Sequence, residues 1–269
     1  MNFPQNISDA ERQAFISDCE LASCSHSLAE HFAALKASRA LTASDPVAAA
    51  EAAVVGGNLL AFAEGFSRQN KEDLMNSFLF ATLVANKKYL PETEGQQWYG
   101  QFNKVLATLG WLSTNWSYAN YRSTQQRFTM DQAGLEILGS AIAAAALPGP
   151  ASAAMLKVAA DAVKTLMKKE EPLRLFERQT KMHRGGNFRI GACHESADGT
   201  VTVAMGAVNF QAQSAITDVL FWEWSNTEVS TYRGEDCLVL NTGLYAKVRQ
   251  QILDKLGKNA ESAIDEFDI

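Results

Sequence analysis

The sequence predicts an α+β fold, in which a helical N-terminal two-thirds packs on a C-terminal antiparallel β-sheet that is followed by a final helix. Apolar residues in the first part recur with the 3.6-residue period of helices. After Arg184-Gly185-Gly186 the period changes to two, and Asp198-Gly199 is a strong hairpin signal. We expect one domain over residues 1–269, helical over 1–184 and β-rich over 185–269, with helices on one side of the sheet.

Helix start and stop signals divide the first part. A capping box at Ser8–Glu11 opens a helix, and the apolar stripe that follows it runs to Leu35. A second capping box at 129–132 opens another helix. The expected helices after the first one cover residues 47–66, a segment that begins at 70–73, residues 94–109 with Gly110 as the stop, residues 129–147, and residues 151–169.

The β-rich part is predicted from alternating residues. The Asp198-Gly199 turn joins strands 188–195 and 200–210. Three shorter strands are expected over 216–222, 228–232 and 236–240. Asn241 then caps a helix that Gly257 stops, and a short acidic tail follows.

The composition limits the classes of protein to which this chain can belong. With 47% hydrophobic and 20% charged residues the chain is an ordinary globular protein, and its net charge of −6 argues against a nucleic-acid partner. The four cysteines lack zinc spacing, so reduced thiols are expected. Residues 1–9 have neither the basic nor the apolar region of a signal peptide. We therefore expect a chain that is cytoplasmic as synthesised, with release or membrane association as later fates. If it acts outside its cell, it must leave by lysis or through a dedicated machine.

No catalytic or metal motif is recognisable. Cys193 and His194 are neighbours on a predicted strand and point to opposite faces, so they cannot pair as nucleophile and base. A cysteine-dependent enzyme that uses another partner for Cys193 stays an alternative. Cys19, His26 and Glu30 share one helix face, which we interpret as a solvated polar face rather than as a metal site.

The hairpin suggests a site around Cys193. A two-residue turn places Cys193 opposite Ala204, with Gly191 and Gly206 beside them on the same face. Small residues leave a trough along the strand. Either a helix fills this trough, or an acyl chain does, and the thiol is then its natural attachment point.

Two further segments suggest contact with a membrane. Where the helical part meets the β-rich part, four cationic residues lie close together in the sequence: Arg178, Lys181, Arg184 and Arg189. Clusters of this kind contact anionic lipid head groups. An ordinary solvated linker is the other interpretation. The helical hairpin over 137–163, which is uncharged from Ile137 to Leu156, is similar to the hairpins that pore-forming toxins release. Its other interpretation is a buried central pair of helices.

The order of these features resembles a known family. Helices over the N-terminal part, the Trp98-Tyr99 and Gly110-Trp111 pairs, and a late β region opened by a cysteine are similar to the Erwinia virulence factor (Evf) family. That family belongs to bacteria that persist in insect guts, and it carries a palmitate linked by a thioester to a cysteine. The resemblance implies a lipid on Cys193, with Cys237 as the competing position.

The sequence thus predicts a non-enzymatic virulence or toxin-like factor, S-acylated on Cys193 and in contact with lipid or a membrane surface. Gly191, Ala204 and Gly206 would line the acyl chain, and no cofactor is expected beside this covalent palmitate. A pore-forming toxin and a cysteine-dependent enzyme are the alternatives.

Overall fold

The computed structural model describes residues 7–22, 50–145, 147–257 and 264–268. Its helices are α1 (Asp9–Asp18), α3 (Arg68–Lys88), α4 (Gly95–Leu109), α5 (Met130–Ala144), α6 (Gly149–Leu166), α7 (Glu170–Thr180), α8 (Thr242–Ala246) and α9 (Arg249–Leu256). Its strands are β1 (Glu51–Val55), β2 (Asn58–Phe62), β3 (Trp111–Ser113), β4 (Ser117–Tyr121), β5 (Lys181–Met182), β6 (Gly185–Glu195), β7 (Val201–Ala212), β8 (Val229–Leu240) and β9 (Ile264–Asp268). The mixture of helices with a mostly antiparallel sheet agrees with the predicted class in outline.

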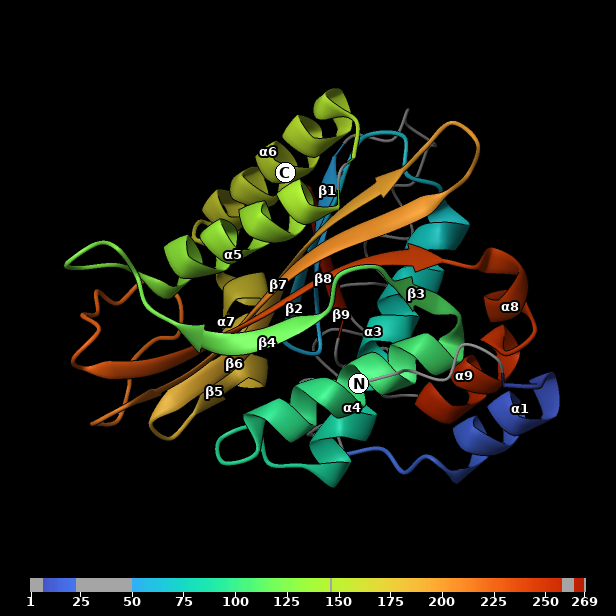
Figure 1. Ribbon diagram of the computed structural model, residues 1–269, viewed down its shortest axis with the longest axis horizontal. Helices are drawn as coiled ribbons and strands as arrows, with labels where there is room; N and C mark the ends of the chain where they lie inside the picture. Colours follow the sequence, from blue (N-terminus) through green and yellow to red (C-terminus); the bar gives the residue numbers. More distant parts are fainter. Residues whose placement is uncertain (1–6, 23–49, 146, 258–263, 269) are drawn as a thin grey trace.

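A single sheet in the order β3-β8-β7-β6-β2-β1-β9 separates two apolar cores, with β4 paired to β8 and β5 to β6. The first core lies between one face of the sheet and α3, α4 and α9. The second core lies between the other face and α5, α6 and α7. Figure 1 shows α5 and α6 on one side and α3, α4 and α9 on the other. The prediction of helices on one side was therefore wrong.

The predicted helix over 47–66 is also wrong, because residues 51–62 form the β1–β2 hairpin. Val55 pairs with Asn58, and the two residues between them, Gly56 and Gly57, have φ values of 55° and 81°. Only glycine adopts two successive positive φ angles easily, and such a pair makes the tight turn that matches the twist of two strands. The strands are apolar on both faces because both faces are buried, so the alternation that marks a half-exposed strand is missing.

The sheet is neither confined to the C-terminal third nor wholly antiparallel. β2 pairs with β6 in parallel, from Asn58 opposite Arg189 to Phe62 opposite Cys193. Residues 111–121, which lie well before the β-rich part that the sequence predicts, supply β3 and β4. The residues expected to form an acidic tail supply β9, which pairs with β1. An early strand, β1, and a late strand, β9, thus lie side by side in one sheet.

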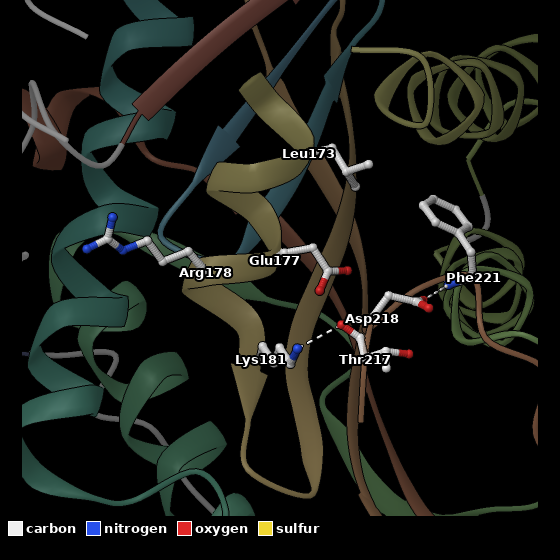
Figure 2. Close-up of a pocket in the computed structure, with 7 residues that line it drawn as sticks. All are labelled: Leu173, Glu177, Arg178, Lys181, Thr217, Asp218 and Phe221. Atoms are coloured by element: carbon white, nitrogen blue, oxygen red, sulfur yellow. Dashed lines mark hydrogen bonds between the residues drawn. The ribbon is translucent and has the colours of Figure 1, made fainter. Parts of the chain in front are cut away.

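Residues 216–222 do not form the predicted strand, and β8 is one continuous strand where two were expected. The segment turns instead, because the Asp218 Oδ1 atom accepts hydrogen bonds from the backbone N–H groups of Phe221 (2.8 Å) and Trp222 (2.9 Å). Figure 2 shows this segment beside α7. An aspartate that bonds to the backbone ahead of it favours a turn over a strand.

Helix ends follow their capping signals. Ser8 and Glu11 form the predicted capping box of α1, and Gly110 ends α4 in the left-handed conformation with a φ of 104°. The first helix was expected to continue into a stripe that reaches Leu35, but α1 ends at Asp18, and the continuation past residue 22 lies outside the described residues.

The predicted hairpin of α5 and α6 is present, but it forms an outer layer and not the centre of the fold. The inner faces of both helices pack on the second core, whereas Leu156 on the outer face is 41% exposed. Among the described helices none is long and apolar enough to cross a membrane. One-sided burial of this kind is what an amphipathic layer over a sheet requires.

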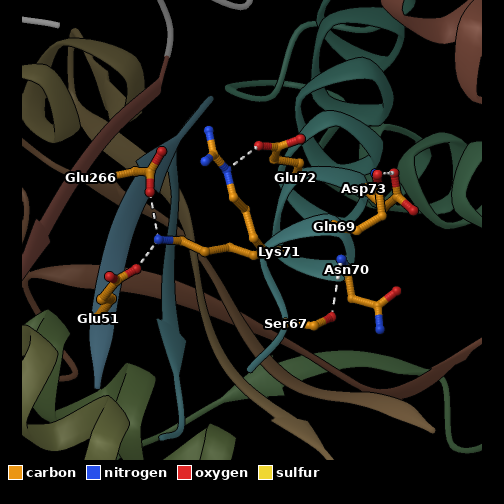
Figure 3. Close-up of polar contacts among 9 residues, drawn as sticks. Glu51, Ser67, Gln69, Asn70, Lys71, Glu72, Asp73 and Glu266 are labelled. Carbon is orange, nitrogen blue, oxygen red and sulfur yellow. Dashed lines mark hydrogen bonds and ion pairs between the residues drawn. The ribbon is translucent and has the colours of Figure 1, made fainter. Parts of the chain in front are cut away.

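Lys71 ties α3 to the edge of the sheet. Its ammonium group pairs with Glu51 of β1 and, at 2.5 Å, with Glu266 of β9, as Figure 3 shows. Burial disfavours the charged lysine, but the two carboxylates outweigh burial and raise its pKa. The pair of acidic partners therefore holds β9 against β1 through a side chain of α3.

Gly206 of β7 gives a test of how α5 meets the sheet. A Cβ atom at Gly206 would lie 2.7 Å from the backbone nitrogen of Leu138 and 2.8 Å from the carbonyl oxygen of Gly134. We expect Gly206→Ala to push α5 outward and to lower the free energy of unfolding by about 1–3 kcal/mol, measured by urea denaturation.

The matched control is Gly139→Ala on α5 itself, where an added Cβ meets nothing within 4 Å. This substitution should stabilise the protein by up to about 1 kcal/mol, because alanine favours helix over glycine. A Gly206→Ala protein as stable as the wild type would contradict the close approach of α5.

Candidate functional site

Three of the residues that sequence reasoning singled out, Arg189, Gly191 and Cys193, lie on β6. Successive side chains of a strand point to opposite faces. One face of β6 therefore carries, in order, Asn187, Arg189, Gly191, Cys193 and Glu195, and its neighbours on this face come from β2 and β7. This row meets the first core, beneath α3 and α4.

Cys193 is fully buried in the first core. Its strand partners are Phe62 on β2 and Val203 on β7, which are both apolar. Burial raises the pKa of the thiol far above its ordinary value, and no charged group contributes to that shift. The raised pKa keeps the thiol protonated at neutral pH. His194 points to the other face of the strand, and neither strand partner of Cys193 is a base.

The predicted pairing of the hairpin is wrong by one residue. Cys193 pairs with Val203, and Ala204 pairs with Ala192 instead. The connection spans residues 196–200, where the Ser196 N–H donates to the Thr200 carbonyl at 3.0 Å and the Gly199 N–H to the Ser196 carbonyl at 2.8 Å. Asp198-Gly199 thus forms part of a longer loop, and a slip of one residue moves every partner to the other face.

The small residues around the thiol consequently divide between the two faces. Gly191 shares the face of Cys193, but the Leu60 side chain covers it, 2.9 Å from where a Cβ would lie. Ala204 and Gly206 face the second core, where α5 closes over Gly206. The trough expected beside Cys193 is therefore filled by a side chain of strand β2, whereas a helix, α5, closes only over Gly206.

The four cations of the predicted membrane-contact cluster do not share one surface. Arg178, Lys181 and Arg184 are exposed, whereas Arg189 is 1% exposed, so its assignment to membrane contact was wrong. Arg189 is buried because it lies inside β6, a strand that is buried on both faces. The other three stay a prediction.

A surface pocket between α7 and the 217–221 segment contains two of these cations and two acids. Arg178 and Lys181 line it with Glu177 and Asp218, and Lys181 donates to the Thr217 carbonyl at 2.7 Å. Figure 2 shows the Arg178 side chain pointing away from the other charged groups. Burial raises the pKa of Glu177, and Asp218 adds to the shift. The pocket thus carries both signs of charge.

Arg189 is held by neutral groups. Its Nε donates to the Asn58 side-chain oxygen at 2.6 Å and its Nη2 to the Gly56 carbonyl at 2.9 Å. The guanidinium lies over the rings of Trp98 and Phe102, 4.5 and 5.3 Å from their centroids. Burial lowers its pKa to about 9, so it still carries its charge at neutral pH. Sequence reasoning missed this site, although the apolar neighbours Phe188 and Ile190 are a sign of a buried strand.

A buried carboxyl group was also missed. Asp236 of β8 is fully buried on the face of the first core, where the Ser113 hydroxyl donates to it at 2.7 Å. Burial raises its pKa to about 6, and the bond from Ser113 opposes the shift.

The other two cysteines in the described part of the chain do not form a second site. Cys237, the competing position for a lipid, is buried on the opposite face from Cys193 and pairs with Ala204. Cys19 caps the end of α1, and burial raises its pKa to about 11. His26 and Glu30, named with Cys19 above, lie outside the described residues, and the part that is described contains no cluster of metal-binding side chains.

Comparison with known proteins gives a weak structural resemblance. No protein-family model matches the chain, and no curated protein does. A solved structure described as the Evf virulence factor is similar over 84% of this chain and 88% of its own, at 12% identity and a TM-score of 0.30. The family membership suggested by the sequence stays a prediction.

The buried Asp236 predicts a pH dependence of stability. Because the folded state holds the proton more tightly than the unfolded state, stability should rise as pH falls from about 6 towards 4. At pH 7 the buried carboxylate destabilises the fold by on the order of 2 kcal/mol. We expect Asp236→Asn to raise the free energy of unfolding at pH 7 by about that amount and to have little effect at pH 4, measured by urea denaturation.

Asp254→Asn is the control, since Asp254 is exposed on α9 and its substitution should change stability by less than about 0.5 kcal/mol at either pH. An Asp236→Asn protein that is destabilised at pH 7 would show that the carboxylate makes a favourable contact instead.

Proposed function

We propose that the chain is a non-enzymatic protein that carries a long-chain acyl group as a thioester on Cys193. The observation that carries the proposal is the complete burial of this thiol in an apolar core, away from any ionised partner among the described residues. The wider role, a virulence or toxin-like factor, rests on the sequence resemblance.

The surroundings of Cys193 favour a holding role over a catalytic one. A cysteine nucleophile needs a base or a nearby cation that generates the thiolate. The strand partners of Cys193 supply neither, and its imidazole neighbour faces the other core. A thioester in the same surroundings would be shielded from the water that hydrolyses it.

The burial of Cys193 also determines when, relative to folding, the acyl group could be attached. The thiolate would attack the carbonyl carbon of an acyl thioester donor, and the thiol of the donor would leave with the proton. Because the folded core encloses Cys193, this transfer would precede closure of the core. A sixteen-carbon chain buried there would contribute on the order of 10 kcal/mol, at about 0.8 kcal/mol per methylene.

Room for the chain must come from movable side chains. Leu60 fills the space above Gly191, next to Cys193 on β6, and Phe62 and Phe66 pack edge to face at 5.2 Å on the same side. In the proposed acylated protein these side chains repack around the chain, and Leu60 moves away from Gly191.

Intact-mass measurement tests the proposal. Protein purified from the organism that makes it should be heavier than its bare polypeptide by one acyl group, and hydroxylamine, which cleaves thioesters, should remove the difference. Cys193→Ser should have the bare mass from the start.

Cys237→Ser is the matched control, because Cys237 is also buried but lies on β8, on the opposite face of the sheet from Cys193. This substitution should leave the added mass in place. Wild-type protein with the bare mass would refute the acyl group. Added mass that is lost from Cys237→Ser, and not from Cys193→Ser, would move the attachment to the second core.

A further inference from the structure

The buried charge of Arg189 lacks an anionic partner among the described residues. Burying a cation is unfavourable unless an anion or several hydrogen bonds compensate it. A guanidinium has five N–H donors, and the bonds to Asn58 and Gly56 use two of them. Its Nη1 atom is buried without a hydrogen-bond partner in the described part of the chain.

Arg189 lines a cavity of about 160 Å³ between β6, α3, α4 and the end of α7. Trp98 and Asn187 line the same cavity, and none of the described residues around it is acidic. Lys181 also lines the cavity, but its ammonium group donates to the Thr217 carbonyl, so the positive charge of the cavity comes from Arg189. The cavity thus combines positive charge, neutral hydrogen-bonding groups and one aromatic wall.

The guanidinium is held in place without a ligand. Trp98 stacks against it, and the Trp98 indole N–H donates to the Asn86 side-chain oxygen at 2.7 Å, which fixes the ring. Asn58, which accepts from Arg189, is itself fixed because its amide donates to the Thr82 hydroxyl at 3.2 Å. A preorganised guanidinium binds an oxyanion without first losing side-chain freedom.

We propose that this cavity binds a small oxyanion, a carboxylate or a phosphate group, through Arg189. The two unused donors of Nη1, together with the remaining donor of Nη2, suit two parallel hydrogen bonds to two oxygens of one group. The volume is below that of pockets for drug-sized ligands, so the ligand, or the part of it that enters, is small. The site is separate from Cys193 and does not depend on the acyl group.

Calorimetric titration of the full chain tests the site, with sodium acetate and inorganic sodium phosphate as probes and sodium chloride at matched ionic strength as the reference. We expect saturable binding of at least one oxyanion beyond the chloride response. Stronger binding of acetate assigns a carboxylate, and stronger binding of phosphate assigns a phosphate group. An equal response to all three salts overturns the proposal.

Arg189→Gln should weaken binding by at least about tenfold, since it removes charge-assisted hydrogen bonds. Arg184→Gln is the matched control, because Arg184 is an exposed arginine just before β6. The affinity of this variant for the oxyanion should stay within about twofold of that of the wild type. If Arg189→Gln does not fold, Arg189→Lys keeps the charge, loses the two-pronged geometry and should still weaken binding. A folded Arg189 variant that binds as tightly as the wild type overturns the proposal.

Discussion

Burial of the central sheet on both faces is the constraint on which the rest of the structure depends. All residues are buried over 185–193 of β6, 201–210 of β7 and 234–238 of β8, so none of their polar groups reaches solvent freely in the middle of the sheet. A polar group there must find its partner inside the protein. Arg189 packs against aromatic rings and donates two hydrogen bonds. Asp236 accepts a hydrogen bond from the Ser113 hydroxyl, and burial raises its pKa. The chemically distinctive residues are therefore those that the sheet buries.

The same constraint explains the placement of small residues and thiols. Helices on both sides must approach the sheet closely, and Gly206 permits this where α5 crosses β7. Cys193 lies within the first core, and Cys237 is buried on the opposite face of the sheet. In such surroundings a thiol behaves as a small apolar group, and reactivity would need opening of the core.

Local signals in the sequence predicted helix ends well, because caps depend on neighbouring residues alone. Ser8 with Glu11, and Gly110, marked their helices correctly. The prediction failed where the outcome depends on distant partners. Residues 51–62 are apolar on every side, which fits a buried helix as well as a strand between two cores. The burial of Arg189 follows from its parallel pairing with β2, 131 positions away, and no local pattern shows that pairing.

The position of β1 and β2 in the sheet also determines how the chain can be assembled. These two strands form a hairpin early in the sequence, but their outer neighbours, β6 and β9, come from much later segments. Until those segments have been synthesised, both edges of the hairpin carry unpaired backbone groups and apolar side chains on each face. Such an intermediate is open to strand pairing with other chains. The nascent protein should therefore depend on chaperones until β9 has left the ribosome.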